Sequence, residues 1–196
     1  MSATEVAVRL CPVRLNRYIK EANVDLDFDP FAGVEIPYEE QDLEPWELTP
    51  RQRQRRKEVV LKELVTLLEP SGRITNPRKC LIDLRNRENK ATTALGLGIA
   101  VPHVRTPQAK DFVLGVAIAR EPGLWFDAVD EQPVRIFFPM VAPSYNDKFY
   151  RKIEKAIAQA LLREQEDFEE VGFKASLLAA ETPGEVIRLL CDVLDG

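Results

Sequence analysis

The stretch that decides the fold of this chain is residues 87–105, which read Arg-Glu-Asn-Lys-Ala-Thr-Thr-Ala-Leu-Gly-Leu-Gly-Ile-Ala-Val-Pro-His-Val-Arg. Gly96 and Gly98 precede a short apolar run with the composition of a buried strand. Pro102 then fixes the chain directly before His103. We therefore expect a strand that ends on a histidine, held on a rigid element at a point where its side chain can face solvent.

Two helices are predicted before this stretch. The first begins at the N-cap Thr49, because Pro50 takes the first helical position and Gln52 stands three residues after the cap. Its apolar residues recur on one face as far as the Pro-Ser-Gly sequence at 70–72. The second helix begins at Asn76 and ends near the Arg-Glu pair that opens the quoted stretch.

Short strands are predicted in the middle of the chain. Apolar runs at 99–101, 112–119 and 134–141 are bounded by Pro, Gly and Asp. The turn residues 120–123 indicate that the second and third runs are joined antiparallel.

The two ends of the chain complete the expected fold. Residues 15–19 predict a short helix and the alternating residues 24–28 a strand, while helical spacing returns from Asp147 and again after the capping sequence Thr182–Glu185. Helices before and after a cluster of short strands predict an α/β fold, a mixed β-sheet covered by helices on both faces. We expect one domain over residues 1–196.

Acidic residues are concentrated in one segment. The net charge is −5, yet the segment from Glu21 to Glu47 holds ten acids and no Lys or Arg. Its prolines and lack of periodicity predict an exposed acidic insertion at about 29–50, either solvated decoration or a means of selecting partners by charge. Four aromatic residues in or beside it predict that parts of it pack down: Phe28, Phe31, Tyr38 and Trp46.

A basic cluster follows this segment. It places five bases within seven residues: Arg51, Arg53, Arg55, Arg56 and Lys57. Such clusters occur in nucleic-acid-binding proteins. The acidic balance of the whole chain favours the other interpretation, a solvated helix start beside its acidic neighbour. We expect no nucleic-acid partner.

The composition excludes several other classes of protein. Uninterrupted apolar runs are far shorter than the roughly 18 residues of a membrane span, and the N-terminus lacks a signal-like apolar core, so we expect a cytoplasmic protein that does not insert into membranes. Cys11, Cys80 and Cys191 are too dispersed for a disulfide framework or a redox pair and are expected to be buried or half-buried thiols. With a single histidine we expect no zinc site and no cofactor, which leaves only an unsupported all-carboxylate site for Mg²⁺ or Ca²⁺.

The polar residues of the quoted stretch favour an anion. Thr92 and Thr93 offer adjacent hydroxyl donors, and the guanidinium groups of Arg87 and Arg105 match phosphate oxygens. The two glycines, Gly96 and Gly98, let the backbone approach a bound group closely.

His103 is the candidate reactive group. A neutral imidazole carries a nitrogen lone pair that can attack an activated phosphoryl group. The alternative is that His103 only makes a local hydrogen bond at the end of a strand, and the surrounding glycines, hydroxyls and arginines favour the functional interpretation.

This stretch resembles the active-site signature of the type-2 enzyme IIA domain of the bacterial phosphoenolpyruvate-dependent phosphotransferase system. Arg-Glu, Thr-Thr, Gly-x-Gly and Ile-Ala-Val-Pro-His follow in the family order and spacing. That family includes mannitol-type, fructose-type and nitrogen-regulatory proteins, and the resemblance covers nearly the whole chain apart from the acidic insertion.

The resemblance implies a phosphohistidine carrier or regulator of the nitrogen-regulatory kind. His103 would accept a phosphoryl group from a histidine-phosphorylated small carrier protein and pass or signal it to a IIB domain or a regulatory target. Arg87 would help to hold the phosphohistidine, Thr92 and Thr93 fall on Ser/Thr positions of the signature, and Arg105 is a candidate helper.

One departure from the family concerns a second histidine. Many members carry it near the start of the helix after the last core strand, where this chain reads Asn-Asp-Lys-Phe-Tyr at 146–150. Two alternatives to phosphotransfer therefore stay open. One is an interaction module with the same fold and no phosphotransfer, and the other is a hydrolase using His103 as a base with Ser144 or Ser176, which the surroundings of the serines disfavour.

Overall fold

The computed structural model of the chain describes residues 15–35, 43, 47–145, 148–166 and 172–195. The elements follow one another as η1 (Leu15–Arg17), η2 (Glu21–Asn23), β1 (Val24–Phe28), α2 (Pro50–Leu68), η4 (Glu69–Ser71), α3 (Pro77–Glu88), β2 (Ala94–Gly96), β3 (Ile99–Ala100), β4 (His103–Arg105), β5 (Val113–Leu114), β6 (Val116–Ala119), β7 (Ile136–Phe137), β8 (Met140–Ala142), α4 (Lys148–Glu166), α5 (Phe173–Leu178) and α6 (Pro183–Asp195).

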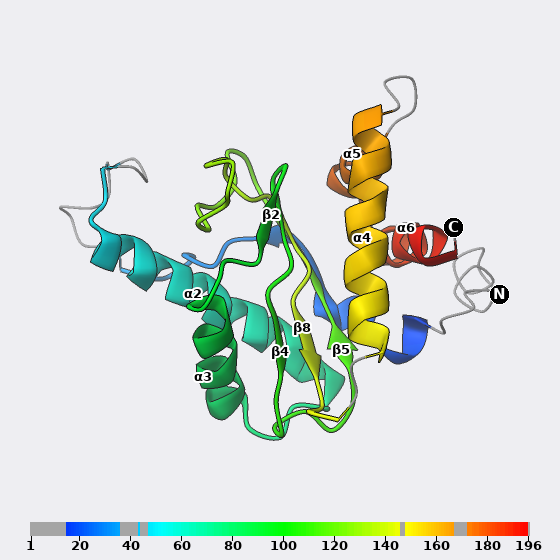
Figure 1. Ribbon diagram of the computed structural model, residues 1–196, viewed down its shortest axis with the longest axis horizontal. Helices are drawn as coiled ribbons and strands as arrows, with labels where there is room; N and C mark the ends of the chain where they lie inside the picture. The colour runs from blue at the N-terminus through cyan, green and yellow to red at the C-terminus, as the bar shows by residue number, and fades with distance from the viewer. Residues whose placement is uncertain (1–14, 36–42, 44–46, 146–147, 167–171, 196) are drawn as a thin grey trace.

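The strands lie between two groups of helices. Figure 1 shows α2 and α3 on one side of them and α4, α5 and α6 on the other. The strands form a five-stranded sheet in the order β1-β6-β7-β3-β2 and a three-stranded sheet in the order β4-β8-β5. Parallel and antiparallel pairs occur in both sheets. The predicted α/β architecture, with mixed strands covered on both faces, is confirmed.

The sequence did not predict that its long apolar runs would divide between two sheets. Val113–Leu114 pairs with β8, whereas Val116–Ala119 pairs with β1 and β7. Gly115 marks the switch, because its N–H donates to the Pro139 carbonyl at 2.9 Å and a Cβ there would stand 2.8 Å from a methyl of Leu68. The run at 134–141 is divided in the same way, into β7 and β8.

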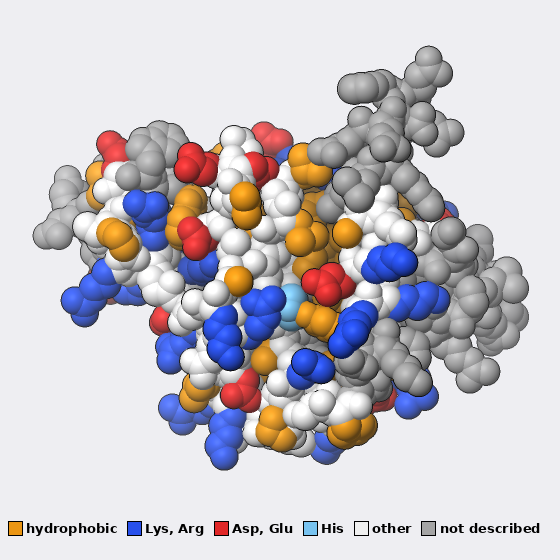
Figure 2. Space-filling model, viewed as in Figure 1, with side chains coloured by type: hydrophobic (Ala, Val, Ile, Leu, Met, Phe, Trp, Pro, Cys, Tyr) orange, Lys and Arg blue, Asp and Glu red, His pale blue; other side chains and the backbone are white. Residues whose placement is uncertain are grey.

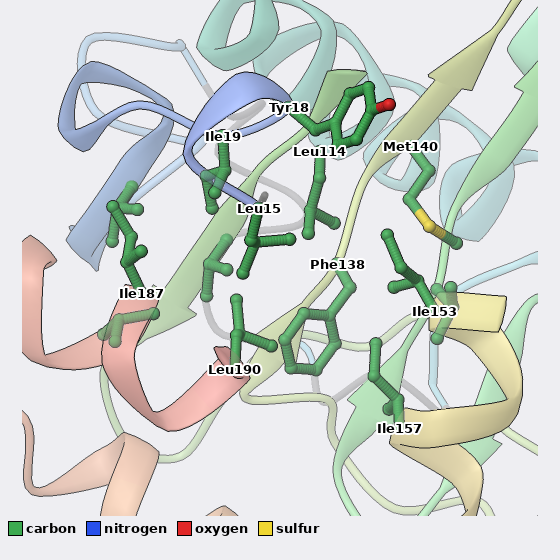
Figure 3. Packing of buried hydrophobic residues seen from close by; sticks show 14 of the residues in the cluster. Leu15, Tyr18, Ile19, Leu114, Phe138, Met140, Ile153, Ile157, Ile187 and Leu190 are labelled. Atoms are coloured by element: carbon green, nitrogen blue, oxygen red, sulfur yellow. The ribbon is translucent and has the colours of Figure 1, made fainter. Parts of the chain in front are cut away.

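Alternation along the strands separates two hydrophobic clusters. Val116 and Ile118 of β6 belong to the cluster that contains residues of α4, α5 and α6, while Ala117 and Ala119 belong to the cluster formed with α2 and α3. Because side chains alternate between the faces of a strand, these clusters are the two faces of one layer. Figure 3 shows the first cluster, in which Ile153, Ile157, Ile187 and Leu190 meet the sheet.

The N-terminal segment is part of this core. Leu15 and Ile19 are fully buried, although the helix predicted there is a single 3-10 turn. The predicted strand at 24–28 is confirmed as β1, which pairs in parallel with β6. Figure 3 shows Leu15, Tyr18 and Ile19 near Leu114, in the same cluster as Ile187 and Leu190 of α6.

Local capping rules predicted the helix starts well. Thr49 accepts a hydrogen bond from the Gln52 amide, and the Gln52 side chain accepts one from the Thr49 amide. Thr182 accepts from the Glu185 amide before α6. Helix α4 begins at Lys148 near the predicted residue 147, which itself lies outside the described residues, and the helix α5 was not expected.

The basic cluster differs from the expectation at one residue. Arg51 and Arg55 are exposed, as a solvated helix start requires, but Lys57 is only 4% exposed. It pairs with Glu88 of α3 at 2.9 Å and with Asp127 at 3.8 Å, both outside the acidic segment, so the interpretation as a solvated charge is wrong for Lys57.

Between β1 and α2, the described residues of the acidic segment form turns. Phe28 is buried and Phe31 packs against the cluster of α2 and α3, whereas Tyr38 and Trp46 lie outside the described residues. Cys80 and Cys191 are buried free thiols, as expected, and Cys11 lies outside the described residues. Burial, with Asp83 nearby, raises the pKa of Cys80 to about 12. No helix of the described part is both long and apolar enough to cross a bilayer.

Candidate functional site

His103 is the first residue of β4, an edge strand of the three-stranded sheet. It pairs with Met140 of β8, and the preceding Pro102 carbonyl accepts from the Met140 amide at 2.8 Å. Val104 belongs to the cluster of α2 and α3, so His103 and Arg105 lie on the other face of the strand. The prediction of one strand that ends on a solvent-facing histidine is wrong in two respects: the predicted strand ends at Ala100 as β3, and His103 begins the separate strand β4 and is only 7% exposed.

The imidazole of His103 is held at one nitrogen. Its Nδ1 lies 2.7 Å from the carbonyl oxygen of Val101. A carbonyl oxygen can only accept, so Nδ1 carries the hydrogen and the lone pair is on Nε2. The sequence left the reactive nitrogen open, and this contact assigns the nucleophilic lone pair to Nε2.

Burial lowers the pKa of His103 below its ordinary value of 6.5, and the positive charge of Arg87 lowers it further. The hydrogen bond to Val101 and the charges of Glu154 and Glu88 act in the opposite direction without reversing the shift. The ring is therefore neutral at pH 7, which is the nucleophilic form.

Tyr150, in the first turn of α4, packs against this imidazole. The two ring centroids are 4.7 Å apart and the planes meet at 72°, an edge-to-face arrangement. Burial raises the pKa of Tyr150 above its ordinary value of 10, with Glu154 acting in the same direction. The phenol is therefore neutral at working pH.

Arg87 lies in the last turn of α3, with its side chain half-buried. Its Nη1 donates to the Ala91 carbonyl at 3.0 Å, and its charge acts on both His103 and Tyr150. Arg105 is exposed at the end of β4 and its charge also acts on Tyr150. The structure thus brings Arg87 into the electrostatic surroundings of His103, and both predicted arginines into those of the neighbouring Tyr150. Figure 2 shows the histidine in pale blue with Lys and Arg side chains on both sides of it.

Glu88, the neighbour of Arg87, joins a buried network that the sequence did not predict. Its carboxylate forms an ion pair with the Lys57 ammonium at 2.9 Å. It also accepts hydrogen bonds from the Thr93 amide at 3.0 Å and the Thr93 hydroxyl at 2.6 Å. The Lys57 ammonium also lies 4.6 Å from the centre of the Phe126 ring. The network therefore fastens the loop between α3 and β2 to helix α2.

Both predicted threonine donors have acceptors within the protein. The Thr92 hydroxyl donates to the Phe126 carbonyl at 3.4 Å and accepts from the Ala94 amide, while Thr93 is buried on Glu88. Their binding of a phosphoryl group stays a prediction. Thr92 also lines a polar hollow of about 470 Å³ between α2 and this loop, and His103 is not among its lining residues.

The two glycines form the hairpin turn between β2 and β3. Leu97 and Gly98 have φ angles of 56° and 76°, as in a type I′ turn. The Leu97 amide donates to Asp130 at 2.7 Å, and a Cβ at Gly98 would stand 3.2 Å from the Lys174 ammonium. Other residues of this protein therefore lie close to the backbone at these glycines. Contact of the glycines with an anion stays a prediction. The described residues contain no group of three or more acids, cysteines and histidines that could hold a metal ion.

The chain is similar to known proteins in sequence and in fold. Residues 47–193 match the family described as phosphoenolpyruvate-dependent sugar phosphotransferase system, EIIA 2. The chain belongs to this family. A curated relative is the PTS system fructose-specific EIIA component of Haloferax volcanii, 29% identical over 139 residues, which are 71% of this chain and 85% of the relative.

Solved EIIA structures have the same fold. The nitrogen regulatory protein IIA-Ntr from Neisseria meningitidis aligns with a TM-score of 0.64 and 22% identity over 87% of this chain and 94% of that one. The enzyme IIA of mannitol from Escherichia coli, in its complex with phosphorylated IIB, aligns with a TM-score of 0.59 and 16% identity over 89% and 97%. These likenesses show that the α/β fold of this EIIA domain is that of the family.

Proposed function

We propose that this protein is a phosphohistidine carrier or regulator that accepts a phosphoryl group on Nε2 of His103. The observation that carries the proposal is the hydrogen bond from Nδ1 to the Val101 carbonyl, which leaves Nε2 with the lone pair in a ring that is neutral at pH 7. Family membership supports the same role.

In the proposed transfer, the phosphoryl group moves from a nitrogen of the donor to Nε2 of His103. The Nε2 lone pair attacks phosphorus, the Nε2–P bond forms as the N–P bond of the donor breaks, and its electron pair returns to the donor nitrogen. The proton stays on Nδ1, where its hydrogen bond to Val101 strengthens as the ring takes positive charge. The guanidinium of Arg87 stabilises the charge on the phosphoryl oxygens.

The donor in this proposal is a small histidine-phosphorylated carrier protein, and the location is the cytoplasm. The recipient is a IIB domain or a regulatory target protein. The alignment with an enzyme IIA in complex with phosphorylated IIB supports the first recipient. The alignment with a nitrogen regulatory protein supports the second and favours the regulatory kind of EIIA.

Intact-mass measurement tests the proposal. The protein is incubated with phosphoenolpyruvate, the general phosphotransferase enzyme and the small carrier of its own organism. We expect the mass of one phosphoryl group to be gained, to be lost in acid, and to be absent in His103→Gln. No gain with these carriers would reject phosphotransfer and leave the interaction module with the same fold.

The same reaction has an expected pH dependence. Protonation removes the Nε2 lone pair, and burial lowers the pKa of His103 below 6.5. The initial rate of phosphoryl acceptance should therefore fall toward acidic pH with a midpoint below pH 6.5. A midpoint between pH 7 and pH 8 would contradict the lowered pKa, once the enzyme and carrier have been shown not to limit the rate.

A further inference from the structure

Tyr150 occupies a position that the fold determines firmly. It stands three and seven residues before Ile153 and Ile157, which are at most 1% exposed, so all three lie on the same side of α4. Packing of this helix side on the sheet brings the half-buried Tyr150 ring against His103, with 4.7 Å between the ring centroids. The contact therefore follows from core packing and not from a free surface side chain.

The imidazole is restrained in two different ways. The Val101 carbonyl fixes Nδ1 through a hydrogen bond, while the Tyr150 ring meets the imidazole at 72° and limits the space in which it can turn. A half-turn of the imidazole would exchange its nitrogens with its carbons, break the bond to Val101 and leave that carbonyl without its partner. The tyrosine opposes this rotation through its ring and needs no charge, since burial raises the pKa of its phenol.

We propose that Tyr150 is a positioning residue, whose ring holds His103 with Nδ1 on the Val101 carbonyl and so restricts phosphorylation to Nε2. The choice of nitrogen rests on the proposed function, because it presumes that His103 is the acceptor. The positioning of the imidazole does not rest on the proposed function, because it exists in the unphosphorylated protein.

The first experiment measures the imidazole tautomer directly. The chain has one histidine, so a ¹⁵N-labelled sample without a histidine tag gives a single set of imidazole signals. We expect two-bond ¹H–¹⁵N spectra to show only the Nδ1–H tautomer in the unaltered protein and in Tyr150→Phe, which keeps the ring. In Tyr150→Ala we expect at least about a tenth of the protein to carry the hydrogen on Nε2 instead. A tenfold ratio corresponds to a free-energy difference of about 1.4 kcal/mol between the two tautomers.

The matched control is Tyr145→Ala, which removes an 85% exposed tyrosine from the turn before the same helix. It should leave the histidine spectrum unchanged. Thermal unfolding checks that each variant is folded. If Tyr150→Ala does not fold, Tyr150→Leu replaces it, and the same second tautomer is expected because a branched side chain presents no flat face.

The second experiment uses phosphoramidate, a small donor that needs no carrier protein. Nε2 attacks its phosphorus, the P–N bond breaks, and ammonia leaves. NMR of the product should show only the Nε2 isomer in the unaltered protein and in Tyr150→Phe, and both isomers in Tyr150→Ala.

Two results would overturn the positioning role. One is a Tyr150→Ala protein that keeps a single tautomer and a single isomer, and the other is a Tyr150→Phe protein that behaves like Tyr150→Ala, which would assign the effect to the hydroxyl. Failure of the carrier reaction alone would reject the proposed function and leave the tautomer result standing.

Discussion

Two ion pairs join the same two helices in very different surroundings. Lys57 and Glu58 are consecutive on α2, and their partners on α3 are Glu88 and Arg85, one turn apart. The side chains of the first pair are 5% and 0% exposed, and those of the second are 40% and 36% exposed. The N···O distances, 2.9 Å and 3.2 Å, differ far less than the exposure does.

The difference shows which contact of α3 determines the geometry of the site. An exposed pair interacts through water and is worth little, whereas removing one partner of a buried pair leaves an uncompensated charge. Glu88 also receives both donors of Thr93, so the buried pair reaches the loop that follows Arg87. We infer that the buried Lys57 helps to hold the site in place, whereas the exposed Arg85 contributes little to it.

The largest effect is expected from Lys57→Met. This change keeps the length of the side chain and removes its charge, so the Glu88 carboxylate is left buried without its cation. We expect the free energy of unfolding to fall by about 3–5 kcal/mol. Urea denaturation followed by circular dichroism measures it.

The double variant Lys57→Met/Glu88→Gln is the control for this prediction. It removes the stranded charge and keeps a side-chain oxygen for the donors of Thr93, so it should be more stable than Lys57→Met by about 1–2 kcal/mol. A double variant as unstable as the single one would mean that Lys57 acts through packing and not through its charge.

The second effect concerns Arg87, which adjoins Glu88 in the sequence but is half-buried and donates to the Ala91 carbonyl. We expect Arg87→Ala to slow phosphoryl acceptance about 10²- to 10³-fold, because a donor to the phosphoryl oxygens is lost. The free energy of unfolding should change by less than about 1 kcal/mol. Initial rates and urea denaturation separate the two quantities, and a variant that unfolds would contradict a role toward the ligand.

The smallest effect is expected from Arg85→Ala. The pair with Glu58 is exposed, so its loss should cost less than about 1 kcal/mol and should diminish further in high salt. A double-mutant cycle with Glu58→Ala measures the pair itself. A coupling as large as the Lys57 effect would remove the contrast between the two pairs.

Local rules predicted much of this molecule. The cap at Thr49, the strand at 24–28 and the helix after Thr182 depend on neighbours a few residues away, and all three are present. Extended structure around His103 was predicted from its own residues in the same way, although the structure divides the segment into β3 and β4. By contrast, the switch at Gly115 depends on Leu68 and Pro139, which are distant in the sequence.

The other residues of the site could not be predicted, because their contacts also depend on residues that are distant in the sequence. Lys57 was one of five similar bases, and only the position of Glu88 at the end of another helix distinguishes it. Tyr150 belongs to the segment 146–150, which lacks the second histidine of many family members, and its contact with His103 exists only after α4 packs on the sheet. Sequence patterns point to His103 as the candidate acceptor, and tertiary packing selects the residues that surround it.

Strand β1 has a consequence for where this domain begins. The family match starts at residue 47, but β1 hydrogen-bonds along β6 and the buried Leu15 and Ile19 precede it. A fragment cut at residue 47 would leave β6 as an open sheet edge beside exposed apolar surface, a combination that promotes aggregation. The working boundary for expression therefore lies before Leu15, well outside the region that the family shares by sequence.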